Sequence, residues 1–279
     1  MSTKKVWFVT GASKGLGLTL VKKLLTEGYS VAATSRNVSE LQKVISAENS
    51  DFLPLEVDLV NENSVSEAIS KTVEKFGQLD VIVNNAGYGQ LGTLEELTDK
   101  ESRQNFDTNV FGSLNIIRKS MPYLRAQKSG LVINIASIGG LSGDFPGWGI
   151  YCATKFAVVG FTEALAAEAK EFGVNATVVY PGYFRTDFLT GGSLRTPENE
   201  IDAYATARQI QKAHEQDING NQPGDPEKAA VALIELAAME NPPVHLVLGS
   251  DAFQMATNKL STLQNEISDF KTLSISTDY

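Results

Sequence analysis

Short apolar runs alternate with amphipathic stretches along most of the chain. Seven runs rich in β-branched or other apolar residues predict strands at residues 5–10, 30–35, 51–58, 79–86, 130–137, 175–182 and 244–249. The runs are nearly continuous in hydrophobicity, which is typical of parallel strands buried on both faces. Strands that alternate with helices form a parallel sheet covered on both sides. The pattern therefore predicts an α/β fold with one doubly wound parallel sheet of about seven strands and helices on both faces.

Three sequence signals predict where helices begin. Ser64 with Glu67, and Thr98 with Glu101, have the spacing of a capping box. Pro226 precedes a long apolar stretch, which indicates the first position of a helix. We therefore expect helices to begin near these three points.

One polar region interrupts the alternation. Residues 188–224 are rich in glycine and polar residues around a helix-like stretch at 201–218. The region is interpreted either as a surface excursion or as a mobile substrate lid at the end of the sixth strand. We expect a single domain over residues 1–279, with its core at 4–250 and a C-terminal helix and tail at 251–279.

Composition excludes several classes of protein. The chain has 279 residues, 42% of them hydrophobic, a net charge of −9 and a pI near 4.9. No Lys/Arg run is present, so we expect no nucleic-acid partner. Cys152 is the only cysteine, which excludes a disulfide framework, and we expect no metal. The N-terminal apolar stretch is too short for a signal peptide and no other stretch approaches a membrane span, so we expect a cytoplasmic protein without a membrane partner.

A glycine-rich stretch follows the first predicted strand. Gly11, Gly15 and Gly17 lie in "TGASKGLG", where a strand-to-helix turn is expected. Glycines there serve a tight turn, or they let backbone N–H groups approach a pyrophosphate at a helix N-terminus. The spacing is not the G-x-G-x-x-G form, but the position at the first strand–helix junction favours a nucleotide site.

The end of the second strand indicates which nucleotide binds. An acidic residue there suits the ribose hydroxyls of NAD, whereas an arginine suits the 2′-phosphate of NADP. Here the strand ends with Ser35 and Arg36, and Lys14 adds a second cation from the glycine turn. These residues favour NADP(H), although both cations also fit ordinary solvated side chains.

Tyr151 and Lys155 are four residues apart in an otherwise apolar helical stretch. This spacing places the phenol and the ammonium on one helix face. An unperturbed tyrosine has a pKa of about 10, and a cation within about 6 Å lowers it. The pair is therefore suited to acid–base catalysis, with Lys155 expected to lower the pKa of Tyr151.

The motifs stand in the order found in one family. "TGASKGLG" (10–17), Asp58, "NNAG" (84–87), Asn109, Ser137, "YCATK" (151–155) and "PGYFRT" (181–186) resemble the classical short-chain dehydrogenase/reductase family from about residue 4 to 250. The resemblance implies a Rossmann-type sheet, a nicotinamide cofactor and reversible hydride transfer between that cofactor and an alcohol or carbonyl. "YCATKF" is similar to the hydroxysteroid dehydrogenase-like branch, although a bulk-tolerant ketone reductase fits equally well.

The resemblance also implies catalytic roles. Tyr151 corresponds to the proton donor and acceptor, and Lys155 to the residue that tunes it and binds the nicotinamide ribose. Ser137 corresponds to the hydroxyl that holds the substrate oxygen. Asn109 corresponds to the residue that links Lys155 to a water-mediated proton path.

The same resemblance implies the cofactor-binding residues. Asp58 corresponds to an adenine contact and Thr186 to a contact with the nicotinamide carboxamide. The cofactor-binding set as a whole is Gly11, Ser13, Lys14, Gly15, Leu16, Gly17, Arg36, Asp58, Leu59, Asn85, Ala86, Gly87, Tyr151, Lys155, Pro181, Gly182, Phe184 and Thr186.

The loop before Tyr151 departs from the family pattern. Ser137 and Tyr151 are one residue further apart than is common, and we expect Ser137 to keep its place while the loop bulges; Ser142 is the less favoured substitute. Cys152 is expected to be a buried filler and His214 a solvated side chain. The predicted substrate pocket is lined by Gly139, Phe145, Trp148, Tyr183 and Phe188, which suits a hydrophobic substrate.

Two other functions compete with an NADP(H)-dependent carbonyl reductase or alcohol dehydrogenase. A non-catalytic NADP(H)-binding regulator would keep the fold and lose the chemistry, but the retained reacting residues argue against it. A serine hydrolase would need a G-x-S-x-G elbow, which Ser137 does not provide. The resemblance also implies a homodimer or homotetramer.

Overall fold

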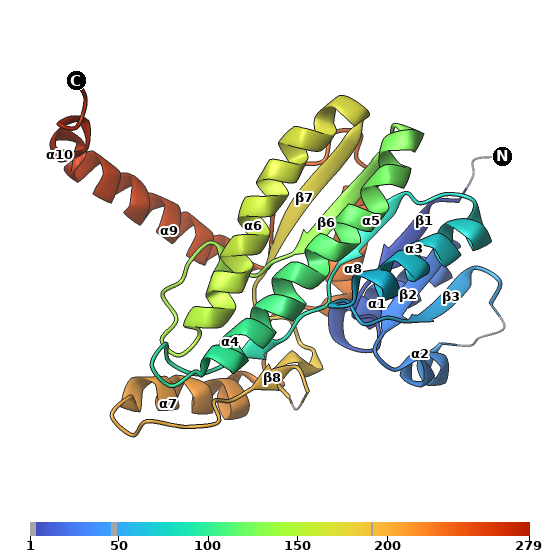
Figure 1. The fold of residues 1–279 in the computed structure, drawn as a ribbon. Helices are drawn as coiled ribbons and strands as arrows, with labels where there is room; N and C mark the ends of the chain where they lie inside the picture. The colour runs from blue at the N-terminus through green and yellow to red at the C-terminus, as the bar shows by residue number, and fades with distance from the viewer. Residues whose placement is uncertain (1–3, 46–48, 191) are drawn as a thin grey trace.

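The computed structural model describes residues 4–45, 49–190 and 192–279. Its centre is a sheet of seven parallel strands in the order β3-β2-β1-β4-β6-β7-β9 (Figure 1). The strands are β1 (Val6–Val9), β2 (Ser30–Ser35), β3 (Phe52–Glu56), β4 (Val81–Asn84), β6 (Gly130–Ile135), β7 (Val174–Pro181) and β9 (His245–Leu248). All seven predicted strands are confirmed, and the order reverses between β1 and β4, as in a Rossmann-type fold.

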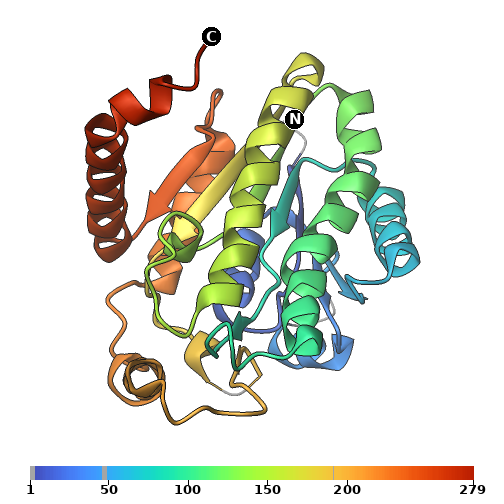
Figure 2. The same ribbon diagram turned by 60° about the vertical axis from the view of Figure 1, so that its left-hand side comes forward.

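Helices cover both faces of this sheet, because each strand is apolar on both sides. Trp7 and Val9 of β1 face one core cluster, whereas Phe8 between them faces the other. The first face carries α1 (Gly15–Thr26), α2 (Val38–Val44) and α8 (Pro226–Ala238). The second face carries α3 (Glu62–Phe76), α5 (Gly112–Gln127) and α6 (Gly149–Ala169), which lie side by side in Figure 2.

A helix begins at or within two residues of each of the three predicted points, but only one of the two predicted capping boxes is present. Thr98 and Glu101 form a reciprocal capping box at the start of α4 (Asp99–Phe106), and Pro226 opens α8. The capping box predicted at Ser64 is wrong, because α3 begins two residues earlier at Glu62, where Asn61 is the cap and accepts the Ser64 N–H at 3.2 Å. The Ser64 hydroxyl instead accepts the N–H of Asp58 at 3.2 Å and holds the loop after β3.

The expectation that no stretch approaches a membrane span needs correction at α6. By length and composition, residues 149–172 are long and apolar enough to cross a membrane. In the fold this helix packs against the sheet, and it buries Lys155 and Thr162 on its inner face. Its apolar character therefore has an explanation as part of the protein core.

Residues 188–190 and 192–224, the segment predicted as a lid and called the lid below, lie beyond the carboxyl ends of the strands and are not a simple polar loop. β8 (Leu194–Arg195) pairs in parallel with β5 (Gly89–Gln90), a small sheet that the sequence did not predict. The predicted helical stretch is present as α7 (Ala205–Lys212) followed by a π-helical turn over 213–218. The lid is therefore attached to the loop that follows β4.

The chain ends in a helical arm that projects from the body of the molecule (Figure 1). The arm consists of α9 (Ser250–Asp269) and α10 (Lys271–Ile275). Only Ala252 and Ala256 of α9 are buried, both near its first turn. The predicted C-terminal helix and tail are thus mostly helix, and most of this helix is exposed.

Candidate active site

One cleft of about 900 Å³ opens at the carboxyl ends of β1, β2, β4, β6 and β7, under the lid. This is the edge where open α/β sheets bind ligands, at the point where strand order reverses. All but two of the predicted site residues line the cleft. They are Gly11, Ser13, Lys14, Gly15, Leu16, Arg36, Asp58, Leu59, Asn85, Ala86, Gly87, Ser137, Gly139, Phe145, Trp148, Tyr151, Lys155, Pro181, Gly182, Tyr183, Phe184, Thr186 and Phe188.

The glycine turn is held against the loop after β4. The Asn85 amide donates to the carbonyls of Thr10 and Gly11 at 2.9 and 3.0 Å, and the Thr10 hydroxyl accepts the N–H of Asn85 at 3.0 Å. A Cβ on Gly11 would lie 2.7 Å from the Cα of Ala86. Gly17 does not line the cleft; a Cβ there would lie 2.5 Å from the Asn85 amide nitrogen, so this glycine serves packing.

The end of the cleft away from Tyr151 carries several charges. Lys14, Arg36 and Asp58 lie there as expected, and Glu40 of α2 also lines the wall. Arg195 of the lid adds a third cation, with its guanidinium 4.1 Å from the centre of the Tyr88 ring. The sequence reasoning missed Glu40 and Arg195.

Ser137, Tyr151 and Lys155 meet at the other end of the cleft. The Ser137 hydroxyl accepts the N–H of Gly139 at 3.1 Å and lies within hydrogen-bonding reach of the Tyr151 phenol. The Lys155 ammonium lies 5.7 Å from the centre of the Tyr151 ring and donates to the carbonyl of Ile135 at 2.9 Å. Both side chains on α6 are buried. The helical spacing therefore brings the phenol and the ammonium together as predicted.

Burial decides the charge states of this pair. It lowers the pKa of Lys155 from 10.5 to about 8. It also raises the pKa of the Tyr151 phenol, and the smaller opposing effect of the Ser137 hydroxyl does not cancel it. The expectation that Lys155 lowers the Tyr151 pKa is therefore wrong for this structure, because burial raises that pKa and Ser137, not Lys155, is the group that opposes the rise. The raised pKa keeps the phenol protonated at neutral pH, which is the form that donates a proton.

Asn109 lies behind the cleft and does not line it. It is part of a π-helical turn (Asp107–Phe111) between α4 and α5. Its amide accepts the N–H of Tyr88 at 3.0 Å and donates to the carbonyl of Tyr88 at 3.0 Å and to the Thr154 hydroxyl at 3.1 Å. Asn109 therefore braces the loop after β4 against α6, the helix that carries Lys155.

The longer loop before Tyr151 leaves Ser137 in place, as expected. Residues 138–140 form a 3-10 turn that packs tightly on α6, where a Cβ on Gly140 would lie 2.8 Å from the Lys155 carbonyl. Ser142 lies outside the cleft wall, and its N–H donates to the carbonyl of Ile138 at 3.0 Å. Ser137 therefore lines the cleft, and Ser142 does not take its place.

Aromatic side chains surround the Tyr151 phenol. The ring of Trp148 packs edge-on at 5.3 Å between centroids, and the ring of Phe188 lies at 6.2 Å. Leu189, Leu194 and Ile210 of the lid belong to the same apolar cluster as Phe145. Cys152 belongs to this cluster, and burial raises the pKa of its thiol to about 11, so it is a filler as expected. The wall beside the reacting groups is therefore apolar.

His214 is buried, and the expectation of a solvated histidine is wrong. Its Nδ1 lies 2.8 Å from the Ile210 carbonyl, which can only accept, so Nδ1 carries the proton. Its Nε2 therefore accepts from the Tyr183 hydroxyl at 2.8 Å. The imidazole also packs 5.0 Å from the ring of Trp148. This contact joins the lid to the pocket wall, and no sequence motif marked it.

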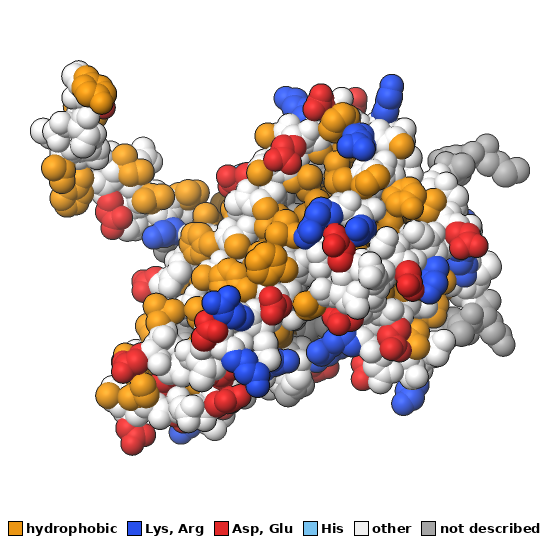
Figure 3. Space-filling model, in the orientation of Figure 1, with side chains coloured by type: hydrophobic (Ala, Val, Ile, Leu, Met, Phe, Trp, Pro, Cys, Tyr) orange, Lys and Arg blue, Asp and Glu red, His pale blue; other side chains and the backbone are white. Residues whose placement is uncertain are grey.

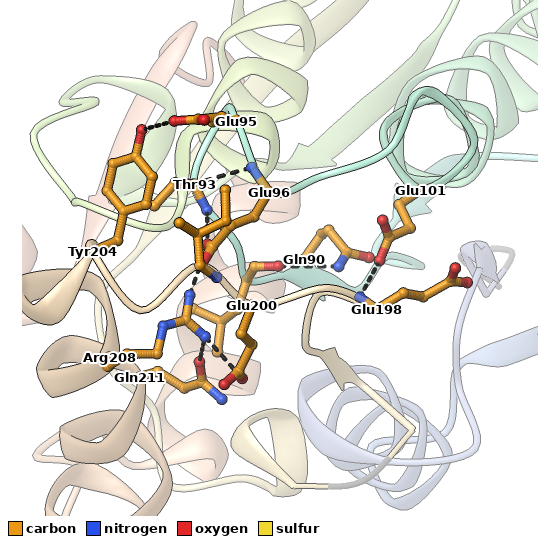
Figure 4. A network of polar contacts seen from close by, with 12 residues as sticks. Gln90, Thr93, Glu95, Glu96, Glu101, Glu198, Glu200, Tyr204, Arg208 and Gln211 are labelled. Carbon is orange, nitrogen blue, oxygen red and sulfur yellow. Dashed lines mark hydrogen bonds and ion pairs between the residues drawn. The ribbon is translucent and has the colours of Figure 1, made fainter.

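Two buried carboxylates hold the first half of the lid (Figure 4). Glu96 accepts the N–H groups of Thr93 at 2.7 Å and Ile201 at 2.8 Å, and it pairs with Arg208 of α7 at 2.7 Å. Glu101 accepts the N–H of Glu198 at 2.9 Å. Burial alone would raise the pKa of the Glu96 carboxyl, but these donors together hold it below its ordinary value.

Replacing Glu96 by glutamine should loosen the lid. A neutral amide has one acceptor oxygen instead of two, and it removes the negative charge that compensates Arg208. The free energy that holds the lid in place should therefore fall by about 2–4 kcal/mol. We expect proteolytic cleavage within residues 190–224 to accelerate roughly tenfold or more. Glu235→Gln, at an exposed position of α8, is the matched control. Equal cleavage rates in both variants would show that Glu96 does not hold the lid.

Comparison with known proteins agrees with this architecture. The profile described as "short chain dehydrogenase" matches residues 5–194. A 3-ketodihydrosphingosine reductase of Bacteroides thetaiotaomicron is 36% identical over 248 residues, 88% of each chain. A short-chain dehydrogenase of Streptomyces avermitilis has a solved structure with a TM-score of 0.91, 34% identity and full coverage of both chains. The structure of ElxO with NADP bound has a TM-score of 0.74 at 27% identity, covering 90% of this chain and 99% of that one.

The sheet defines a Rossmann-type fold, and the matches identify the protein as an oxidoreductase. The matched profile covers most of the chain, and the relatives align over nearly its whole length. The chain belongs to the short-chain dehydrogenase family.

Proposed function

We propose that the protein catalyses the NADP(H)-dependent, reversible reduction of a ketone or aldehyde to an alcohol. The observation that carries this proposal is the buried group of Ser137, Tyr151 and Lys155, which shares one cleft with the glycine turn. A protonated phenol beside a serine hydroxyl is suited to bind and protonate a carbonyl oxygen.

The residues at the glycine turn fit a dinucleotide. α1 begins without a side-chain cap, so its first N–H groups are available to an anion. Gly15 lines the cleft, with Thr186 facing it from the other wall. Lys14 and Arg36 favour the 2′-phosphate of NADP(H), and the similar protein ElxO has been solved with NADP bound.

The reaction divides among the chain's own groups. Bound NADPH would supply the hydride to the carbonyl carbon. The Ser137 hydroxyl, whose oxygen already accepts from Gly139, is free to donate to the carbonyl oxygen. Tyr151 gives its phenolic proton to the same oxygen, and the Lys155 ammonium stabilises the phenolate that remains. The buried aromatic wall keeps water away from these groups.

The pocket favours a ketone carried on an apolar group. Trp148, Phe188 and Leu189 surround Tyr151 on the substrate side, and Tyr183 is occupied by its bond to His214. One of the relatives is named for the reduction of a long-chain keto compound, 3-ketodihydrosphingosine. A long-chain or ring-bearing ketone therefore fits better than a small polar one.

A substrate panel tests this proposal. Purified protein should oxidise NADPH, seen as loss of its absorbance, with long-chain 3-keto compounds or steroid ketones. Acetone is the small-ketone control, and we expect its kcat/KM to be at least tenfold lower, because each buried CH₂ adds about 0.8 kcal/mol. Activity on none of the ketones or aldehydes with either nicotinamide cofactor would contradict the proposed reaction.

A further inference from the structure

The C-terminal arm carries an apolar stripe that its own chain does not cover. Figure 3 shows hydrophobic side chains along the arm, well away from the sheet. Phe253, Leu260, Ile267 and Phe270 are each more than half exposed, and Leu263 is 43% exposed. A soluble domain rarely leaves so many large apolar side chains on one helix without a partner.

The stripe has the spacing of a coiled-coil seam. Its members alternate three and four residues apart, which is the 3.5-residue repeat of a heptad. The positions of type a and type d are Phe253, Ala256, Leu260, Leu263, Ile267 and Phe270, and of these only Ala256 is buried against its own chain. Polar residues fill the opposite face of α9, including Ser261, Asn265 and Ser268. A narrow seam of this kind fits another helix with the same seam, rather than a broad surface.

We propose that the arms of two copies of this chain pair antiparallel about a two-fold axis. The axis passes near residues 261 and 262, so that Leu260 of one arm faces Leu263 of the other. Phe253 at the base of each arm then faces Phe270 at the tip of the second arm. Each exposed position of type a then faces one of type d, except that Ile267 lies opposite Ala256, which packs against its own chain, and the contact is self-complementary.

Charge agrees with this register. Lys259 and Glu266 lie at flanking positions on one side of the seam. In the antiparallel pair, Lys259 of each arm lies beside Glu266 of the other, and the contact forms twice by symmetry. The arrangement also places the two bulky bodies at opposite ends of the paired arms, which are about 30 Å long.

The available area is close to what a stable interface needs. Seven large apolar side chains of the arm, counting Leu273 and Ile275, are at least 43% exposed. Together they offer on the order of 700 Å², against about 800 Å² a side in a standard interface. A membrane surface is a poorer occupant, because residues 250–279 carry four acidic and only two basic side chains and form no basic face.

The base of the arm is attached to the active site. Ala252 and Ala256 pack against Ile138, one residue after Ser137. Asp251 accepts the N–H of Tyr183 at 2.7 Å. Changes that test pairing should therefore spare the first two turns of α9 and be made further along the arm.

Charged substitutions on the seam test the proposal. Leu263→Glu with Ile267→Glu should halve the particle mass measured by sedimentation equilibrium, while kcat per chain changes less than twofold. Ser261→Glu with Asn265→Glu adds the same charges at the same spacing on the opposite face and should leave the mass unchanged. An unchanged mass for the seam variant, or an equal loss in the control, would overturn the pairing.

Cross-linking tests the orientation. A tagged Leu260→Cys chain mixed with an untagged Leu263→Cys chain should form mainly the mixed disulfide under mild oxidation. Predominant self-cross-linking of each variant would overturn the antiparallel register. Flotation of the unmodified protein with phosphatidylcholine–phosphatidylserine vesicles would overturn the choice of a second copy as the occupant.

Discussion

Replacing Tyr151 by phenylalanine is expected to lower kcat for carbonyl reduction by about 10²–10⁴-fold, the usual contribution of a positioned general acid. The substitution removes the phenolic proton that the proposed reaction transfers to the substrate oxygen, and it leaves only the hydrogen bond from the Ser137 hydroxyl. The ring stays in its place between Trp148 and Phe188, so the pocket should keep its shape. Steady-state assays in both directions, with titration of NADPH fluorescence, measure the effect.

Cofactor affinity separates this outcome from a loss of folding. The dissociation constant for NADPH should change less than about threefold, because Tyr151 stands at the substrate end of the cleft. Cys152→Ala is a suitable control, since it removes a neighbouring side chain that takes no part in proton transfer. A Tyr151→Phe variant with near-normal kcat would refute the assignment of Tyr151 as the acid.

Replacing Arg36 by aspartate is expected to reverse the cofactor preference. The change removes a cation from the end of the cleft that the 2′-phosphate should occupy, and it adds a carboxylate suited to a free ribose hydroxyl. We expect NADPH affinity to fall by about 2 kcal/mol or more, roughly 30-fold, while NADH affinity is kept or rises. Binding of both cofactors at low ionic strength measures the shift.

Glu40 provides the comparison for this experiment. It lines the same end of the cleft and carries the opposite charge to Arg36. Glu40→Gln should strengthen NADPH binding modestly and leave NADH binding almost unchanged. If the unmodified protein binds NADH more tightly than NADPH, then Glu40 outweighs the two cations and the proposed preference is wrong.

The sheet could be predicted because its strands are locally distinctive. Continuous apolar runs mark strands that are buried on both faces, and all seven were found from them. The pairing of β5 with β8 could not be predicted, because Gly89–Gln90 and Leu194–Arg195 are too short to show any periodicity. The capping pattern at Ser64 predicted the wrong cap residue, because Asn61 is a strong cap three residues earlier.

The cleft could be predicted where a motif recurs at fixed spacing, as with the glycine turn and the Tyr151–Lys155 pair. Residues from the lid could not be predicted in the same way. His214 and Arg195 reach the cleft only after the chain has folded back. Glu96 lies in a strongly acidic stretch, a pattern that predicts solvated side chains, yet its carboxylate is bonded to the lid. The direction in which the Tyr151 pKa shifts also depends on how completely the fold buries the phenol, and the spacing of Tyr151 and Lys155 does not reveal that burial.

The attachment of the lid to the loop after β4 also bears on how the molecule folds. Glu96 and Ile201 are 105 residues apart in the chain, and the segment between them contains β6, α6 and β7. Contacts of such large sequence separation carry a high loop-closure cost and form late unless the intervening chain is already compact. The lid should therefore dock only after most of the sheet has assembled. A chain in the course of synthesis would hold Tyr151 and Lys155 on their helix well before it could enclose a substrate.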